Sequence, residues 1–587
     1  MAEKKSSNPK PTSQPSKLES DRQMLAEARE QGLASTLGTY VKMSGPGWLQ
    51  SAITLGGGSL ASSLYLGVIA GYSMMWVQPL AMILGIIMLS AIGYVTVVTG
   101  ERPFRAINEH VNPVLGWGWA LAVFAANIVW CLPQYALAQA AVSQNLLPGL
   151  FDDKEGKIAQ WAATTFSENE FFREHMDEIV FVVPVLLLAT FVTWSYDRGG
   201  RGLKIFETIL KIMVGLIVIS FIAVIFQLSF FAEQGLPWGS IAAGFWPDFS
   251  SFFTPAETFN QLLDDIGPAG DATRKIWSDY IVDQQQDVII SAAATAVGIN
   301  MTFLFAYSLL RKGWTREFSG LIKFDLATGM LIPFILATSC VVIASASRFH
   351  TEVPEGFSRE PGTNRVNVPE SALKSYDEIM AACGREHHEA SGAEKELAVR
   401  LVRRDAGKLA QSLRPVTGDF FANYIFGFGV LAMTFSTITI LMLISGFVFT
   451  ELLGLPPGGW PHRFGTLLAG VGGSFGPIVW QGAKAYLAVP TSVFGYVLLP
   501  LAYLTFFLLM NQKSILGDDR PRGLGRLMWN LLMSLSVAAA TLGSVYMAHK
   551  KAGWNGIGAI AAFTLLVILS HFYRVNTKKY DEAAQQI

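Results

Sequence analysis

The stretch G-P-G-W-L-Q-S-A-I-T-L-G-G-G-S-L-A-S-S-L, residues 45–64, is the strongest indication of the fold. It is apolar enough to cross a membrane, yet three glycines and a serine, Gly56, Gly57, Gly58 and Ser59, lie at its middle. Each glycine costs a helix about 1 kcal/mol relative to alanine. In a bilayer every amide that a break releases also needs a partner, so a break is tolerated only beside a cavity or packed protein. The alternative interpretation is close helix packing, which small residues also permit.

The whole chain shares the apolar character of this stretch. Of 587 residues, 51% are hydrophobic and 15% are charged, whereas soluble domains carry about a quarter charged residues. Runs of about twenty nearly uncharged residues are long enough to cross a membrane as helices. Their continuous apolar character, without alternation, argues against a β-barrel. We therefore predict an all-α polytopic protein of the lipid bilayer, and no basic patch indicates nucleic acid.

Twelve candidate spans follow one another along the chain. Basic residues flank the connections that are cytoplasmic if the N-terminus is inside, with Lys550 and Lys551 as exceptions. We expect a multi-pass protein of the plasma (cytoplasmic) membrane with both termini in the cytoplasm. The predicted parts are a disordered cytoplasmic tail at 1–42, a first five-span repeat at 43–232, an extracytoplasmic loop at 233–287, a second repeat at 288–511 with an extracytoplasmic insertion at 347–418, two spans at 512–575 and a cytoplasmic tail at 576–587.

A second span is also interrupted. Gly298, Asn300 and Thr302 break an apolar run at a similar depth, although Asn and Thr often only bond a neighbouring helix. The two interrupted spans are the first members of two successive sets of five. Paired interrupted spans in matching halves are the best sequence pointer to a transporter site, because half-helix ends present amides and carbonyls there. We predict a secondary transporter of two inverted five-helix repeats that works by alternating access.

Three stretches resemble one family. Residues 45–100 carry a G-P opening, a G-Y pair followed by Trp76, and a final V-T-G. Residues 435–451, F-S-T-I-T-I-L-M-L-I-S-G-F-V-F-T-E, and 508–517, L-L-M-N-Q-K-S-I-L-G, complete the likeness. Together they resemble the natural-resistance-associated macrophage protein (NRAMP) family of metal transporters. The resemblance implies the LeuT-like fold of inverted repeats and, from the family, transport of a metal cation.

The residues that bind metal in the family are replaced in this chain. The family's first helix breaks at D-P-G-N, whose Asp and Asn bind the metal, and the matching positions hold Gly56 and Ser59. The family's M-P-H in the sixth helix falls at Asn300 and Thr302. A divalent cation that leaves water needs anionic or strongly donating ligands. A proton-coupled, high-affinity metal site of the usual family type is therefore not expected.

Positions linked to proton movement in the family are also neutral. The family's D-L-A-E becomes C-L-P-Q, with Cys131 and Gln134, and a second family histidine falls at Tyr307. The family's glutamine ligand in the tenth span falls near Ser492. Intramembrane carboxylates usually mark ion and proton pathways. We expect Cys131, Gln134 and Tyr307 to lie along a pathway that lacks such groups.

Several ligands remain open for this neutral site. The amides at Gly56 to Gly58 could accept a carboxylate. Alternatively, the hydroxyls and the amide of Ser59, Asn300, Thr302 and Ser492 could bind a neutral polar solute or a cation that keeps its waters. A second hypothesis is a non-transporting receptor or sensor with a transporter fold. No nucleophile–base pair or phosphate loop indicates an enzyme, so we predict no catalytic residue and no cofactor.

A coupling ion, sodium or a proton, is a separate question. In LeuT-like carriers sodium often lies between the unwound first helix and hydroxyls of the eighth, which makes Ser436, Thr437 and Thr439 candidates. The alternative is that these hydroxyls only bond the carbonyl one turn back in their own helix. Among the tryptophans, Trp130 is the candidate for a wall of the pathway, since the others are mostly interfacial anchors.

Overall fold

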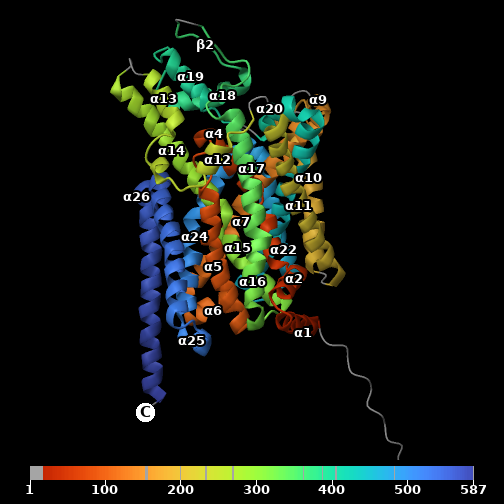
Figure 1. The fold of residues 1–587 in the computed structure, drawn as a ribbon, viewed down its shortest axis with the longest axis vertical. Coiled ribbons are helices and arrows are strands. Elements are labelled where there is room, and N and C mark those ends of the chain that lie inside the picture. Colours follow the sequence, from red (N-terminus) through yellow and green to blue (C-terminus); the bar gives the residue numbers. More distant parts are fainter. Residues whose placement is uncertain are drawn as a thin grey trace, which may run out of the picture.

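Long helices standing side by side make up most of the protein, and a smaller cap covers one end, as the computed structural model shows (Figure 1). The structure describes residues 17–585 except 152–155, 198–199, 232–234, 267–269, 361–362, 387, 404–405 and 481–482. Within these residues nine helices are long and apolar enough to cross a membrane, or ten if one bent pair counts as a single span. The total of twelve spans stays a prediction.

The first repeat holds one bent pair, four long helices and three short ones. Its helices are α3 (Pro46–Thr54), α4 (Gly57–Ala70), α5 (Val77–Thr99), α6 (Pro103–His110), α7 (Pro113–Ala141), α10 (Glu170–Asp197) and α11 (Gly200–Phe231), with the short α8 (Pro148–Phe151) and α9 (Lys157–Thr165) before α10.

The second repeat also begins with an interrupted helix. Its helices are α14 (Asp271–Ala296), α15 (Ile299–Lys312), α16 (Ser319–Leu326), α17 (Ile332–Phe349), α21 (Phe426–Leu452), α22 (Gly459–Ser474), α23 (Gly476–Val479) and α24 (Ala488–Asn511), followed by α25 (Lys513–Leu516) and α26 (Gly523–Gln585).

Both predicted breaks are present, and each is two residues long. Between α3 and α4 only Leu55 and Gly56 leave the helix, and the two halves meet at an angle of 53°. Between α14 and α15 Val297 and Gly298 are extended. The broken helices contact one another, since α14 packs against α4 and α15 against α3. Helix α7 packs beside them, against α21, α22 and α24.

The insertion predicted at 347–418 forms a folded part of the cap. It contains the antiparallel strands β1 (Ser358–Arg359) and β2 (Val366–Asn367) and three helices, α18 (Glu370–Ala382), α19 (Gly392–Arg400) and α20 (Ala406–Asp419). Helix α19 begins with a capping box in which the Ser391 and Glu394 side chains each accept from the other's backbone amide. Helices α12 (Trp238–Ala243) and α13 (Glu257–Asp265) precede α14, and α13 lies beside the insertion in the cap (Figure 1).

The prediction of a disordered tail at 1–42 is wrong from residue 17 onward. Helices α1 (Lys17–Glu30) and α2 (Leu33–Met43) occupy this segment, while residues 1–16 lie outside the described residues. Leu25 of α1 is 1% exposed, and the Arg22 guanidinium lies 3.3 Å from the Glu317 carboxylate. The polar composition hid these contacts, because an amphipathic helix needs only one apolar face to pack.

Two other predicted segments are partly helical. The last part of the segment predicted as a loop at 233–287 belongs to α14, which begins at Asp271. Its last carboxylate, Asp287, accepts from Lys550 at 2.8 Å and from Lys551, so these lysines pair with an acid although they break the charge pattern of the loops. At the other end α26 bends at Gly553, where φ is 56°, and continues to Gln585, so the predicted tail at 576–587 is helical up to that residue.

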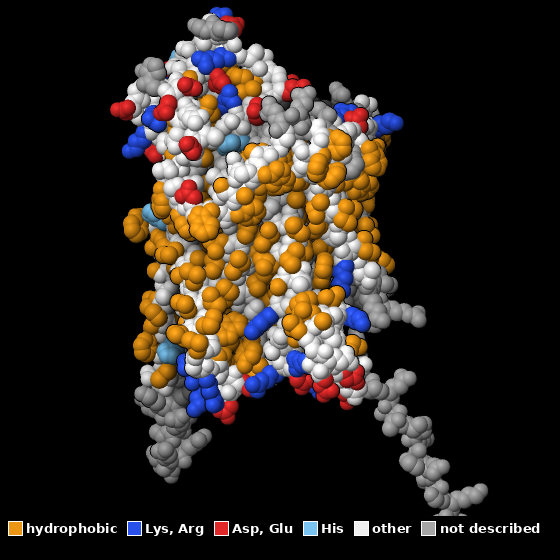
Figure 2. Space-filling view, viewed as in Figure 1, with side chains coloured by type: hydrophobic (Ala, Val, Ile, Leu, Met, Phe, Trp, Pro, Cys, Tyr) orange, Lys and Arg blue, Asp and Glu red, His pale blue; other side chains and the backbone are white. Residues whose placement is uncertain are grey.

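A broad apolar band crosses the middle of the face shown in Figure 2, and charged side chains gather at the two ends of the bundle. Exposed Leu187, Phe191, Ile219 and Leu542 belong to this apolar surface. Lysine and arginine predominate at the end opposite the cap, where acidic side chains also occur, and both signs mix on the cap (Figure 2). This distribution is that of an integral membrane protein whose helices contact lipid through the band.

Candidate substrate site

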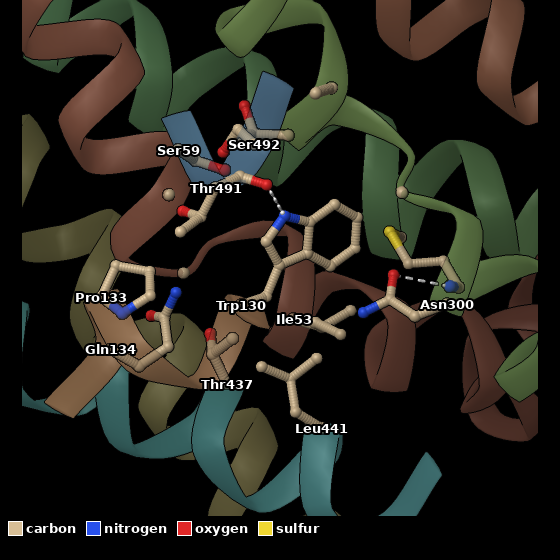
Figure 3. A pocket seen from close by; sticks show the side chains of 16 residues that line it. Ile53, Ser59, Trp130, Pro133, Gln134, Asn300, Thr437, Leu441, Thr491 and Ser492 are labelled. Atoms are coloured by element: carbon tan, nitrogen blue, oxygen red, sulfur yellow. Dashed lines mark hydrogen bonds between the residues drawn. The ribbon is translucent and has the colours of Figure 1, made fainter. Parts of the chain in front are cut away.

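A small cavity lies where the two helix breaks meet (Figure 3). Its volume is about 40 Å³, room for a few water molecules at roughly 10–15 Å³ each. Side chains from α3, α4, α7, α14, α15, α21 and α24 surround it. The lining residues are Ile53, Gly56, Gly58, Ser59, Trp130, Pro133, Gln134, Ala294, Thr295, Gly298, Asn300, Met301, Thr437, Leu441, Thr491 and Ser492.

Side chains from other helices satisfy the first break. The Gly57 amide donates to Gln134 Oε1 at 2.9 Å instead of to the Ile53 carbonyl four residues back. The Ser59 hydroxyl donates to the Thr54 carbonyl, so it bridges the two half-helices. Both bonds satisfy polar groups that the interruption of the helix would otherwise leave without helical partners.

The glycines of the first break serve close packing more than backbone freedom. Gly56 has an extended φ of −104°, which any residue can adopt, and Gly57 already belongs to α4. A Cβ on Gly56 would lie 2.3 Å from Thr437 Oγ1, and one on Gly57 would lie 2.6 Å from Leu137 Cδ1. The glycine run therefore combines a helix break with close helix packing, because the chain is interrupted here and the interruption packs tightly against α21 and α7.

The second break carries a buried amide. Asn300 Oδ1 accepts from the Met301 amide at 2.9 Å. Its Nδ2 is buried without a hydrogen-bond partner in the structure, and the residue is 1% exposed. Asn300 lines the cavity, and an unpaired buried amide costs about 1–3 kcal/mol. The geometry indicates that water or a ligand in the cavity accepts from this group.

Trp130 lies among the polar groups of the cavity (Figure 3). Its indole Nε1 donates to the Thr491 carbonyl of α24 at 2.7 Å. The ring also touches two glycines, since a Cβ on Gly298 would lie 2.4 Å from it and one on Gly495 only 1.9 Å. One side chain from α7 thus contacts both the second break and α24.

Comparison with known proteins identifies the family. The family described as natural resistance-associated macrophage protein-like (Nramp) matches residues 47–548, most of the chain. This chain belongs to the Nramp family. A comparison with curated proteins finds no match.

Among solved structures, the chain is similar to the manganese transporter of Eremococcus coleocola. A histidine-to-alanine variant of that protein is 14% identical, with a TM-score of 0.59 over 91% of this chain and 95% of that one. Its complex with an aromatic bis-isothiourea-substituted compound is 15% identical, with a TM-score of 0.58 over 92% and 94%. At this identity the likeness establishes the LeuT-like fold.

Seven of the predicted residues of this Nramp protein line the cavity. Five were predicted for the substrate, and they lie in or near the two breaks or in α24. The remaining two were predicted for other roles, a coupling ion and a pathway. The set is Gly56, Gly58, Ser59, Asn300 and Ser492 together with Thr437 and Gln134.

The other predicted residues lie outside the lining. Thr302 Oγ1 accepts from the Trp119 indole at 3.0 Å, and Ser436 donates to the Ala52 carbonyl at 2.8 Å. Thr439 donates to the Ser436 carbonyl at 2.7 Å, the local bonding considered as the alternative to a sodium site. Gly57 lies in the first turn of α4, Cys131 is buried against Gly473, and Tyr307 stacks on Phe303 with ring centroids 4.3 Å apart.

Sequence reasoning missed part of the lining. Thr491, Met301 and Pro133 border the cavity, but only the fold brings α7, α15 and α24 to one place. The signal that could have found Thr491 is its position beside Ser492, one residue earlier in the same helix. None of the residues that line the cavity is ionisable. Its polar groups are hydroxyls, amides and backbone carbonyls.

Proposed function

We propose that this protein is a secondary transporter that carries a metal cation by alternating access and binds it, with part of its water shell, in the central cavity. Membership of the Nramp family supports the metal cation. The observation that carries the proposal is the position of the cavity, where two helices of matching halves are interrupted and no charged side chain enters. In transporters of this architecture substrate sites lie at such paired interruptions.

The chemistry of the cavity suits a hard cation held weakly. The Thr437 hydroxyl and the Gln134 amide contribute side-chain oxygen atoms to the lining. The carbonyl ends of α3 and α14 add partial negative charge. Oxygen ligands suit hard cations, and affinity rises with the number of charged ligands. With none in the lining, we expect dissociation constants in the millimolar range.

Size favours an ion over an organic solute. The cavity of about 40 Å³ holds roughly three or four waters. An amino acid or organic acid needs a larger space than this conformation offers. A cation that exchanges some waters for protein oxygens fits without rearrangement, so among the substrates left open by the sequence we favour the partly hydrated cation.

Uptake into sealed proteoliposomes tests the proposal. The assay compares Mn²⁺, Mg²⁺, Na⁺ and a panel of amino and organic acids under imposed gradients. We expect saturable uptake of metal cations with millimolar half-saturation. The variant Thr437→Val should raise the half-saturation concentration severalfold. Its matched control is Thr564→Val, because both hydroxyls donate to a carbonyl four residues back but Thr564 is exposed outside the cavity.

Three outcomes would contradict the proposal. Uptake of amino or organic acids without metal uptake would indicate a changed substrate. Absence of flux for every solute in folded protein would favour the receptor hypothesis. Equal effects of Thr437→Val and Thr564→Val would remove the cavity from the transport path.

We also propose which end of the protein faces the cytoplasm, and that sodium or a proton is the coupling ion. The basic end in Figure 2, where both described chain ends lie (Figure 1), would face the cytoplasm. A sodium site at Ser436, Thr437 and Thr439 stays a prediction. Replacing sodium by choline in the uptake assay tests it, and unchanged uptake would argue against sodium. Dependence on an imposed pH gradient would point to the proton instead.

A further inference from the structure

We propose that Trp130 determines which ions the cavity accepts, by filling space that a more fully hydrated ion would need. This inference rests on the proposed cation transport and adds a specificity-determining residue to it. Trp130 directly precedes the C-L-P-Q stretch of α7, residues 131–134. No charge is involved in this role, only the volume and the fixed position of an indole ring.

The indole is held in place on several sides. Its Nε1–H donates to the Thr491 carbonyl at 2.7 Å, which fixes the ring toward α24. Its six-membered ring edge lies against Gly298 in the second break and Gly495 one turn beyond Thr491. Proteins bury a tryptophan stably where its N–H finds a partner and its ring finds a matching surface. Both conditions are met, so the ring is a rigid wall of the cavity.

The two glycines form a slot that matches this ring. A Cβ on Gly495 would lie 1.9 Å from Trp130 Cζ2, and a Cβ on Gly298 would lie 2.4 Å from Cη2. Both distances are far below van der Waals contact. Neither glycine requires a positive φ, so close approach of the indole accounts for the missing side chains. The three residues act as one packing unit that links the second break to α7 and α24.

The volume left beside the ring limits hydration. A cation with six waters needs roughly 60–90 Å³ at 10–15 Å³ per water, and the cavity offers about 40 Å³. An ion must therefore exchange some waters for protein oxygens before it enters. Mg²⁺ dehydrates reluctantly, so the native cavity should disfavour Mg²⁺ relative to Mn²⁺. Removing the indole should relax this preference.

The first test measures the ratio of Mg²⁺ to Mn²⁺ uptake in proteoliposomes. We expect Trp130→Ala to raise this ratio at least threefold, with Trp130→Phe between it and the native protein. The matched control is Trp117→Ala, on the same helix but 45% exposed on the outer surface, which should leave the ratio unchanged. An unchanged ratio in folded Trp130→Ala, or an equal rise in the control, would overturn the proposal.

A second test needs no transport and so separates this inference from the proposed function. A cysteine at position 492, which lines the cavity, is introduced after replacing the three buried native cysteines. Its rate of reaction with a small and a bulky methanethiosulfonate reagent reports the space beside it. Trp130→Ala should accelerate the reaction with the bulky reagent more than the reaction with the small one, and Trp117→Ala should not. Equal acceleration of both reagents would contradict a role in setting size.

A suppressor experiment tests the slot. Gly495→Ala alone should lower the thermal stability or the uptake of the protein, because its Cβ displaces the ring. Adding Trp130→Ala should restore part of what Gly495→Ala removes. If the loss of stability or uptake in the double variant equals the sum of the two single losses, the ring and the glycine act independently. The slot would then not determine the position of the ring.

Discussion

The central cavity and the outlying ends of the broken helices differ in whether they contain ionisable side chains. The cavity is lined by hydroxyls, amides and carbonyls without an ionisable side chain. Away from it the same helices use buried carboxylates, Asp325 beside α3 and Asp287 within α14, which are 0% and 6% exposed. Each of those carboxylates is surrounded by donors. The fold therefore tolerates buried charge, and the neutrality of the cavity is a property of the site.

At the basic end, Asp325 holds the start of α3. It accepts from the Gly45 amide at 3.1 Å, from the Gly47 amide at 2.6 Å and from the Ser44 hydroxyl. These are first-turn donors that no helical carbonyl can satisfy. The negative charge also lies at the positive end of the half-helix. The contact joins the first broken helix to α16.

At the capped end, Asp287 joins α14 to α26. Lys550 lies 2.8 Å from one of its oxygens and Lys551 contacts the other, so one carboxylate pairs with two ammonium groups. Lys550 also lies 2.8 Å from Asp283. Charged pairs therefore fix the outlying parts of the broken helices, while uncharged polar groups line the cavity between them.

The largest expected effect comes from removing the basic-end carboxylate. Asp325→Ala leaves three donors unsatisfied in a buried place, which should lower the free energy of unfolding by about 3 kcal/mol. Thermal unfolding in detergent measures it. The control is Asp518→Ala, a fully exposed partner of Arg522, which should change stability by less than about 0.5 kcal/mol. Equal effects would show that Asp325 does not hold α3.

A smaller loss is expected at the capped end. Replacing both Lys550 and Lys551 by alanine leaves Asp287 without its cations and should cost about 2 kcal/mol. Each single replacement should cost less than half as much, because the other lysine still pairs. Adding Asp287→Asn to the double variant should recover part of the loss. Failure of this rescue would mean that the lysines act through packing and not through charge.

A third variant introduces a negative charge into the neutral cavity and tests how that charge changes metal binding. Asn300→Asp keeps the acceptor for the Met301 amide and adds a carboxylate to the lining. We expect the dissociation constant for Mn²⁺ to fall about tenfold, equivalent to about 1.4 kcal/mol, as measured by titration calorimetry. Asn530→Asp, in α26 and absent from the cavity lining, is the matched control. Tighter binding in both variants would indicate a surface effect.

The smallest expected effect is a dependence of the stability of the cap on pH. Burial alone would raise the pKa of Glu394, but hydrogen bonds from Arg385, the Ser391 amide and Trp277 lower it below its ordinary value of 4.5. A lowered pKa means that the carboxylate stabilises the cap above pH 4.5 and that this is lost as pH falls through the folded-state pKa. Hydrogen exchange in α19, corrected for intrinsic rates, should show lost protection on acidification. In Glu394→Gln that pH dependence should flatten.

The interruptions of the two broken helices could be predicted from sequence because they violate local rules. Three glycines in an apolar span, and Gly298 with Asn300 in its counterpart, conflict with a continuous membrane helix. The family likeness then supplied the order of the helices. The first break falls at Leu55 and Gly56, at the start of the glycine run. The rest of the run packs against side chains of other helices, which no local pattern encodes.

The contents of the cavity were less predictable than its position. Ser59 and Asn300 could be predicted because they lie in the first turn after each break. Thr302 was misplaced because a helix turn of about 100° per residue directs its hydroxyl to Trp119 instead. The Asp287 pairing also escaped prediction, since its partners are more than 260 residues away in sequence.

The position of bound Mn²⁺ tests most directly whether the uncharged cavity binds the metal cation. Crystals of the protein soaked in millimolar Mn²⁺ would be examined by anomalous diffraction. We predict one anomalous peak in the cavity beside Thr437 and Gln134, with water completing its coordination and no carboxylate in contact. A peak at a site with acidic ligands elsewhere in the membrane region, or an empty cavity beside transported Mn²⁺, would contradict the account.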